Sequence, residues 1–149
     1  MTRLRQWLSL LVLVALLVLP GAVMAAGDPK AGDLPRLFER ALSLSRQGDP
    51  QAALPLWDQV LELAPRDAAA WSNRGNIRLM LGDPEGAIAD QTRSIDLAPD
   101  DADPHLNRGT AEEALQRWPE AAADYDWILQ RDPLDASALY NLGNVRGAE

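Results

Sequence analysis

The sequence holds one histidine, and the acidic residues around it come closest to the spacing of a reactive or metal-binding site. Asp101, Asp103 and Glu112 have the spacing of the first, third and twelfth ligands of a calcium-binding loop. Such a loop needs glycine at its sixth position for the sharp turn, and here that position is Leu106. His105 would need a partner group to act as a base or a ligand, and the sequence indicates none. We therefore expect no metal site and interpret His105 as a packing residue.

The sequence also lacks the patterns that are typical of enzymes. It has no nucleophile–base–acid arrangement, no glycine-rich phosphate loop and no paired histidine ligands. Glu112 and Glu113 are adjacent, but neighbouring residues on a helix point apart and cannot act as a catalytic pair of carboxylates. We therefore expect a protein that has no enzymatic activity and needs no cofactor.

The elements that would position a binding site follow from a period of 34 residues. The pattern Asn-x-Gly begins at Asn73 and returns at that spacing at Asn107 and Asn141. Three prolines and three alanines keep the same spacing, namely Pro65, Pro99 and Pro133, and Ala53, Ala87 and Ala121. A fixed pitch of this size is typical of stacked repeats, because one small unit cannot bury its apolar face alone.

Each repeat is predicted to contain two helices. In the second repeat, Asp67 should cap a helix that runs to about Leu81. Asp83 should cap the next helix, with Pro84 at its first position and its end near Leu97. The glycine of Asn-x-Gly then falls inside the first helix, where it lets the two helices approach closely.

On these residues the sequence resembles the tetratricopeptide repeat, whose signature is W-x2-L-G-x2-Y, then A-x3-F, then P. The matching residues are Trp71, Gly75, Ala87 and Pro99 in the second repeat, Gly109, Ala121, Tyr125 and Pro133 in the third, and Leu142 and Gly143 in the fourth. The resemblance implies an all-α fold, a right-handed superhelical solenoid of helix-turn-helix repeats with about three and a half units. The repeats would span residues 34–67, 68–101 and 102–135, with a partial repeat at 136–149.

Charged residues replace two apolar positions of the signature. Arg74 and Arg78 take the places of its leucine and tyrosine in the second repeat, and Arg108 and Glu112 take them in the third. Arg146 is a further period along, so the charges of Arg78, Glu112 and Arg146 alternate in sign. These positions should face neighbouring repeats, and we expect the three residues to form a structural charge ladder.

The N-terminal segment has the pattern of a secretory signal peptide. Arg3 and Arg5 precede an apolar stretch, Trp7 to Leu19, and small residues follow up to Ala26. Removal of the first 25 or 26 residues is expected. The alternative is an uncleaved membrane anchor, because the segment from Trp7 to Ala26 is just long enough to span a hydrocarbon core of about 30 Å. The expected organisation is a signal peptide at 1–26, a linker at 27–33 and the repeat domain at 34–149.

Charge and cysteine content exclude several classes of protein. Removing the first 25 residues takes away two arginines and no acids, so the remaining chain carries 12 basic and 22 acidic residues. This balance argues against nucleic acid or an anionic membrane surface as the main partner. The chain has no cysteine, which excludes a lipid-anchored lipoprotein and disulfide bonds.

The first helices of the repeats should line a concave groove that binds peptide. Their inner-face Asn, Ser and Thr side chains can bond a peptide backbone, while Leu, Met and Tyr receive its side chains. The predicted groove residues are Ser72, Asn76, Leu79, Met80, Leu106, Asn107, Thr110, Tyr140 and Asn144. The repeated Asn73, Asn107 and Asn141 either hold the first helix to its neighbour or bond the ligand.

Some members of the family grip the acidic tails of chaperones with two asparagines and several cations. Asn76 and Asn107 match those asparagines, but Ser72, Ser137 and Asn141 stand where the cations should be. The groove should therefore prefer an extended segment that is uncharged or mildly basic.

These expectations describe a non-enzymatic scaffold with a protein or peptide partner. The phrases NRGN and DPHLNRGTAEEAL are similar to exported tetratricopeptide repeat proteins of photosynthetic organisms, which implies a role in assembly in the cell envelope or thylakoid lumen. Periplasm, thylakoid lumen and the extracellular space are all open as locations. The alternative is a membrane-tethered module that associates with itself. Whether the sequence is a piece of a longer repeat array stays open.

Overall fold

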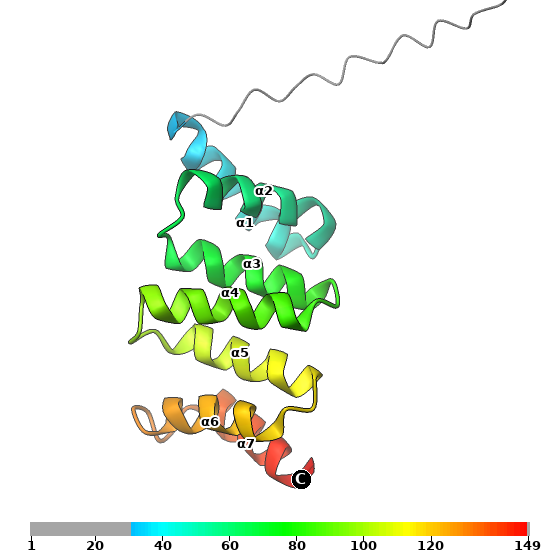
Figure 1. Ribbon diagram of the computed structural model, residues 1–149, viewed down its shortest axis with the longest axis vertical. Helices are drawn as coiled ribbons and strands as arrows, with labels where there is room; N and C mark the ends of the chain where they lie inside the picture. Colours follow the sequence, from blue (N-terminus) through cyan, green and yellow to red (C-terminus); the bar gives the residue numbers. More distant parts are fainter. Residues whose placement is uncertain (1–30, 149) are drawn as a thin grey trace, which may run out of the picture.

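The computed structural model describes residues 31–148, and these form a short 3-10 helix, Ala31–Asp33, followed by seven α-helices. The predicted signal peptide lies outside the described residues. The helices are α1 (Leu34–Gln47), α2 (Pro50–Leu63), α3 (Ala68–Met80), α4 (Pro84–Leu97), α5 (Ala102–Ala114), α6 (Trp118–Leu129) and α7 (Ala136–Ala148) (Figure 1).

The two helices of the second repeat begin where the sequence predicts, because aspartates cap them. Asp67 Oδ1 accepts a hydrogen bond of 2.9 Å from the backbone N–H of Ala70, and Asp83 does the same for Gly86. The first helix of the second repeat ends at Met80, one residue before the predicted end. Gly82 follows in the left-handed region, with φ +80°, and reverses the chain.

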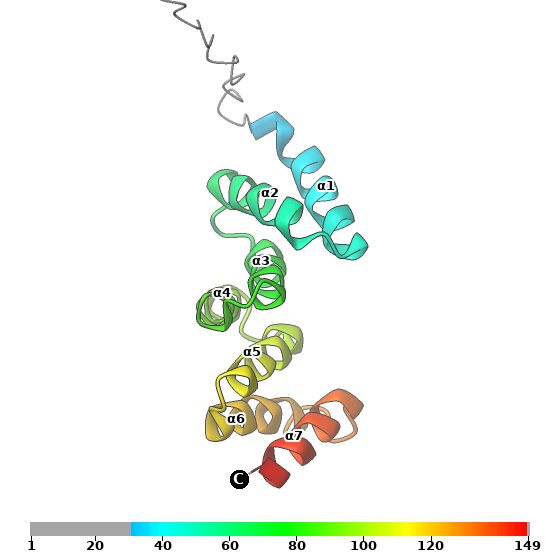
Figure 2. The same ribbon diagram turned by 90° about the vertical axis from the view of Figure 1, so that its right-hand side faces the viewer.

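The helices are arranged in two layers along an elongated array. Figure 2 shows α1, α3, α5 and α7 on one side, which we call the first layer, and α2, α4 and α6 on the other, the second layer. Each helix contacts the next one in the chain, and α3 also contacts α1 and α5. The all-α solenoid of helical pairs predicted from the period is thereby confirmed. No helix within residues 31–148 has the length and apolar character needed to cross a membrane.

Two apolar cores lie at the ends of the array, and a polar layer lies between them. The first core surrounds Trp57 and the second surrounds Tyr125, and both side chains are fully buried. On α4, between them, the buried polar residues are Asp90, Gln91 and Ser94. Helix α4 is therefore held in the array largely by polar contacts, and each of these must find a partner.

Glycines let the two helices of a pair approach closely, as predicted. A Cβ atom on Gly109 would lie 2.6 Å from Tyr125 Cε1, and one on Gly75 would lie 2.7 Å from Gln91 Nε2. Gly143 occupies the same position in α7, and nothing lies within 4 Å of a Cβ there. Helix α7 thus leaves open the face that α3 and α5 bury.

Candidate functional site

An arginine on α3 links three helices through hydrogen bonds. Arg74 Nε and Nη2 each donate a hydrogen bond of 2.8 Å to the Asp90 carboxylate of α4. Its Nη1 donates at 2.8 Å to Asp58 of α2, in the preceding pair. The hydrogen bonds to Asp90 raise the pKa of the Arg74 guanidinium, so it stays charged. We call this group, Arg74 with Asp58 and Asp90, the first arginine clasp.

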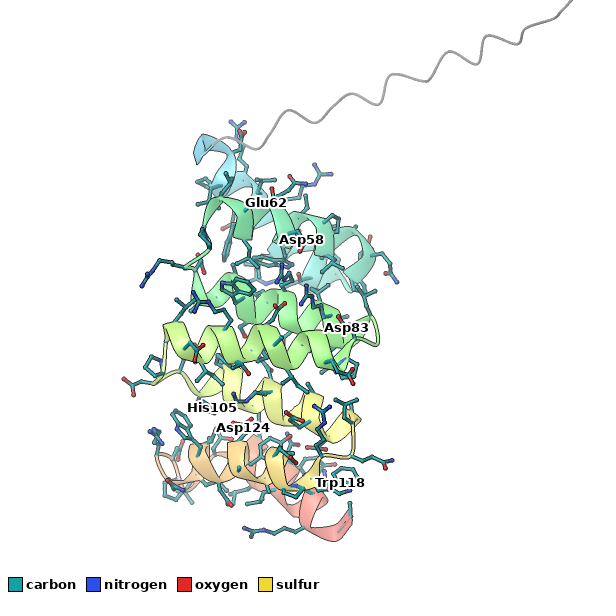
Figure 3. The ribbon with its side chains drawn as sticks, viewed as in Figure 1. Asp58, Glu62, Asp83, His105, Trp118 and Asp124 are labelled. Carbon is teal, nitrogen blue, oxygen red and sulfur yellow. The ribbon has the colours of Figure 1, made fainter. Side chains whose placement is uncertain are left out.

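The same arrangement recurs one repeat later. Arg108 Nε and Nη2 donate to the Asp124 carboxylate at 2.8 and 2.7 Å, and its Nη1 donates to Thr92 at 3.2 Å. His105 Nδ1 lies 2.8 Å from Asp124 Oδ1, and Figure 3 shows the two residues facing each other between α5 and α6. The ring of His105 stacks on Trp127 with 3.8 Å between centroids. His105 is a buried packing residue that orients Asp124. Arg108, Thr92 and Asp124 form the second arginine clasp.

The predicted charge ladder is wrong, because Arg78, Glu112 and Arg146 each pair with a residue outside the set. Arg78 lies 3.2 Å from Asp90, which also belongs to the first arginine clasp. Glu112 lies 3.4 Å from Arg117, and Arg146 lies 3.4 Å from Asp126.

Two hollows lie between the helices of the first layer. The polar hollow, about 340 Å³ in volume, lies between α3 and α5 and is lined by Ala69, Ser72, Asn73, Asn76, Asp101, Asp103 and Asn107. The tyrosine hollow, about 410 Å³, lies between α5 and α7 and is lined by Leu106, Asn107, Thr110, Ala136, Ser137, Tyr140 and Asn141. Asn107 lines both, so the two hollows adjoin.

Most of the predicted groove residues come together in these hollows. Ser72, Asn76, Leu106, Asn107, Thr110 and Tyr140 line one or both of them. The remaining three, Leu79, Met80 and Asn144, line neither hollow. Met80 and Asn144 are exposed and Leu79 is half-buried. That any of the nine residues binds a ligand stays a prediction.

The floor of the polar hollow is held by a residue of the second layer that the sequence did not single out as part of the site. Gln91 Nε2 donates to the Ser72 carbonyl at 3.0 Å and to Asn76 Oδ1 at 2.9 Å. This fixes the Asn76 amide, whose Nδ2 remains as a donor. Asn107 Nδ2 donates to Ser72 Oγ at 3.4 Å, across the gap between α3 and α5. Such a preorganised polar surface loses little entropy when it binds a ligand.

Tyr125 occupies the equivalent place beneath α5. Its hydroxyl donates to the carboxylate of Glu113 and also interacts with Thr110 and Asn141. Burial is the main cause that raises the pKa of Tyr125, and the bond to Glu113 adds to it, so the phenol is neutral. Gln91 and Tyr125 are one period apart, and this spacing is the signal that could have identified both.

The groove is acidic. Asp101 and Asp103 are exposed in the polar hollow, Glu113 lies on α5 beside the tyrosine hollow, and no Lys or Arg lines either hollow. Within the described range 31–148, no three His, Asp or Glu residues are grouped so that they could hold a metal ion. The surface therefore offers hydrogen bonds, apolar contacts and negative charge.

Comparisons with known proteins agree with this fold. The tetratricopeptide repeat family profile matches residues 38–102 and 106–146. The TPR domain of Arabidopsis OM64 has a TM-score of 0.75 at 24% identity, covering 80% of this chain and 98% of its own. The second TPR domain of human RPAP3, in complex with the HSP70 peptide SGPTIEEVD, has a TM-score of 0.73 at 21% identity, covering 78% and 98%.

A third structure, the first TPR of Spaghetti (RPAP3) bound to the HSP90 peptide SRMEEVD, has a TM-score of 0.75 at 22% identity, covering 81% and 96%. A search of curated proteins gave no match. At identities below 25%, the similarity to these structures shows the fold alone. The family profile matches most of the chain. The chain belongs to the tetratricopeptide repeat family.

Proposed function

We propose that this protein is a non-enzymatic interaction scaffold that holds an extended peptide segment of its partner in the concave groove. The observation that carries this proposal is the pair of adjoining hollows, which meet at Asn107 between three helices of one layer. Two of the similar structures are complexes with short peptides, which supports the same use of the fold here.

Hydrogen bonds would orient the segment, and apolar contacts would hold it. Asn76 Nδ2 is free to donate to a peptide carbonyl, since its Oδ1 is engaged by Gln91. Thr110 donates its hydroxyl hydrogen to the Leu106 carbonyl, so its oxygen can accept from a peptide N–H. Leu106 and the 70% exposed Tyr140 offer apolar surface next to these groups. A few such anchors commonly carry most of the binding energy.

The ligand of this groove differs in charge from the peptides in the similar complexes. Those peptides, SRMEEVD and SGPTIEEVD, end in three acidic residues among the last four. Asp101, Asp103 and Glu113 would repel such a tail, and no cation in either hollow would offset that repulsion. The partner segment is therefore uncharged or basic.

Export and a role in assembly are part of the same proposal. The basic residues, apolar stretch and small residues at the N-terminus support export to the periplasm, the thylakoid lumen or the cell exterior. The resemblance to exported proteins of photosynthetic organisms supports an assembly factor of the cell envelope or thylakoid lumen. N-terminal sequencing of the protein purified from its own cells should begin at Ala26 or Gly27. A chain that begins at Met1 or Thr2 would exclude cleavage.

Selection from a random peptide library displayed on phage tests the groove directly. The purified protein should enrich peptides that bind, and Leu106→Ala should weaken them by a factor of about 30, corresponding to roughly 2 kcal/mol for one lost anchor. Leu134→Ala is the matched control, because Leu134 is 84% exposed and lines neither hollow. Selected peptides that bind Leu106→Ala as well as the parent protein would refute binding in the groove.

Self-association is a second candidate, favoured by the uncovered face of α7. The position of Gly143 is open, while Leu139 and Tyr140 are 48% and 70% exposed. Two copies could bury these residues against each other. Light scattering after size exclusion, at several protein concentrations, should show a mass that rises with concentration. A monomer at all concentrations would leave the peptide scaffold as the function.

A further inference from the structure

The two hollows differ in chemistry, and the difference defines a ligand. The polar hollow carries amides, a hydroxyl and the carboxylates of Asp101 and Asp103. The tyrosine hollow is flanked by Leu106 and by the largely exposed ring of Tyr140. A segment that crosses both hollows would meet negative charge in one and apolar surface in the other.

The carboxylates of the polar hollow differ from the aspartates that pair with arginines between the helices. Asp58, Asp90, Asp124 and Asp126 are each paired with an arginine. Asp103 forms no ion pair within the described residues, and Asp101 is engaged only as the cap that accepts from the Asp103 N–H at 3.1 Å. Other capping aspartates, such as Asp67 and Asp83, also form no ion pair among residues 31–148, but Asp101 and Asp103 line the polar hollow and are therefore available to a ligand there.

We propose, resting on the proposed function, that the groove selects a segment with one Lys or Arg side chain and one large apolar side chain. The cation enters the polar hollow beside Asp101 and Asp103, where the amide oxygens of the neighbouring asparagines can accept its remaining hydrogen bonds. The apolar side chain packs in the tyrosine hollow against Leu106 and Tyr140.

The spacing of the two side chains follows from the packing of the helices. Successive helices of one layer that are in contact lie about 8–10 Å apart, and α3, α5 and α7 are in contact in this order. A segment in the extended polyproline II conformation advances about 3.1 Å per residue with three residues per turn, so side chains three positions apart point the same way. The basic and the apolar residue should therefore be about three positions apart in the segment, in one order or the other.

Synthetic peptides test the proposal with fluorescence anisotropy on the full chain. The probe is a fluorescein-labelled ten-residue peptide of Gly, Ser and Thr with one Lys and one Leu three positions apart, prepared in both orders. Two comparison peptides replace the Lys by Gln or the Leu by Ser, and a third places Lys and Leu seven positions apart. With Lys and Leu in at least one of the two orders, the probe should bind at least about fivefold more tightly than each of the three comparison peptides.

A protein variant then locates the cation. Asp103→Asn should weaken the Lys probe by a factor of about three and leave the Gln peptide unchanged, because only a charged side chain loses an attraction. Glu62→Gln removes the same charge from an exposed position on α2 and should change neither affinity. Circular dichroism of each variant establishes that the helices are retained.

Three results would overturn the proposal. If the Lys and Gln peptides bind equally while both are weakened by Leu106→Ala, the groove binds peptides but does not select a cation, and only this inference fails. If both peptides bind and neither responds to Leu106→Ala, the groove function fails with it. If the Lys probe shows no measurable binding in both orders of Lys and Leu, a ligand with a basic and an apolar residue at this spacing is also excluded.

Discussion

Replacement of Arg74 by methionine isolates the first arginine clasp. Methionine keeps much of the aliphatic stem but removes three hydrogen bonds, two to Asp90 and one to Asp58. The side chain of Asp90 is only 2% exposed, so its carboxylate loses its principal partner without gaining water. The substitution should therefore lower the free energy of unfolding substantially, even though α3 can still form.

The magnitude follows from what remains around Asp90. Breaking a buried ion pair by removing one partner costs about 3–5 kcal/mol. Arg78 Nη1 lies 3.2 Å from the same carboxylate and offsets part of the loss, which brings the expected cost to about 2–4 kcal/mol. Loss of the contact to Asp58 adds little to this cost in the free energy of unfolding, because the Asp58 side chain is 48% exposed.

Urea unfolding, followed by circular dichroism and tryptophan fluorescence, measures the cost. Arg93→Met is the matched control, since Arg93 is exposed on α4 and its loss should change stability by less than about 0.5 kcal/mol. The double variant Arg74→Leu with Asp90→Leu should be more stable than Arg74→Met, because the buried Asp90 carboxylate is removed together with its partner, and Arg78, which loses its contact to Asp90, has a side chain that is 27% exposed to water. If Arg74→Met costs no more than Arg93→Met, the clasp does not stabilise the array.

Three further predictions concern stability and titration. Gly109→Ala should cost about 1–3 kcal/mol, because its Cβ would lie 2.6 Å from the buried Tyr125 ring, whereas Gly143→Ala should be neutral or stabilising by up to about 1 kcal/mol; thermal unfolding distinguishes them, and equal effects would contradict the packing described. In a Tyr140→Phe variant, Tyr125 is the one tyrosine left, and its raised pKa predicts that ultraviolet absorbance shows no phenolate at about pH 11 while the chain stays folded. The same shift means that the folded state holds this proton longer than the unfolded state, so stability should fall as the pH rises above about 10, and Tyr125→Phe should reduce that fall; an unchanged dependence would contradict it.

The architecture could be predicted because it rests on local signals that repeat. The aspartate caps and the proline breaks act within one repeat, and they place both helices of the second repeat within about a residue of their observed bounds. The 34-residue period extends this pattern to the other repeats. The close approach of the helices at Gly75 and Gly109 could also be predicted. A glycine in the middle of a helix weakens that helix, so its repeated use there indicates that another helix packs closely against it.

The partners of the charged residues could not be predicted from spacing alone. Arg78 and Glu112 are one period apart, but the rotation between successive helices decides which acid lies nearest to each, and that is a property of the packed array. The arginine clasps did leave a signal, because Arg74 and Asp90 are 16 residues apart and the same pair recurs one period later. The three groove residues outside the hollows, Leu79 among them, share the right helix face but lie beyond the gaps between helices.

Chemical-shift mapping of a bound peptide on the isotope-labelled full chain tests the groove most directly. With the most strongly enriched library peptide as probe, the largest changes should fall on side-chain amides and backbone of α3, α5 and α7 around Asn107, which lines both hollows. Helices α2, α4 and α6 should change least on their outward surfaces. Changes confined to those outward surfaces, or to the face of α7 around Gly143, would contradict binding in the groove.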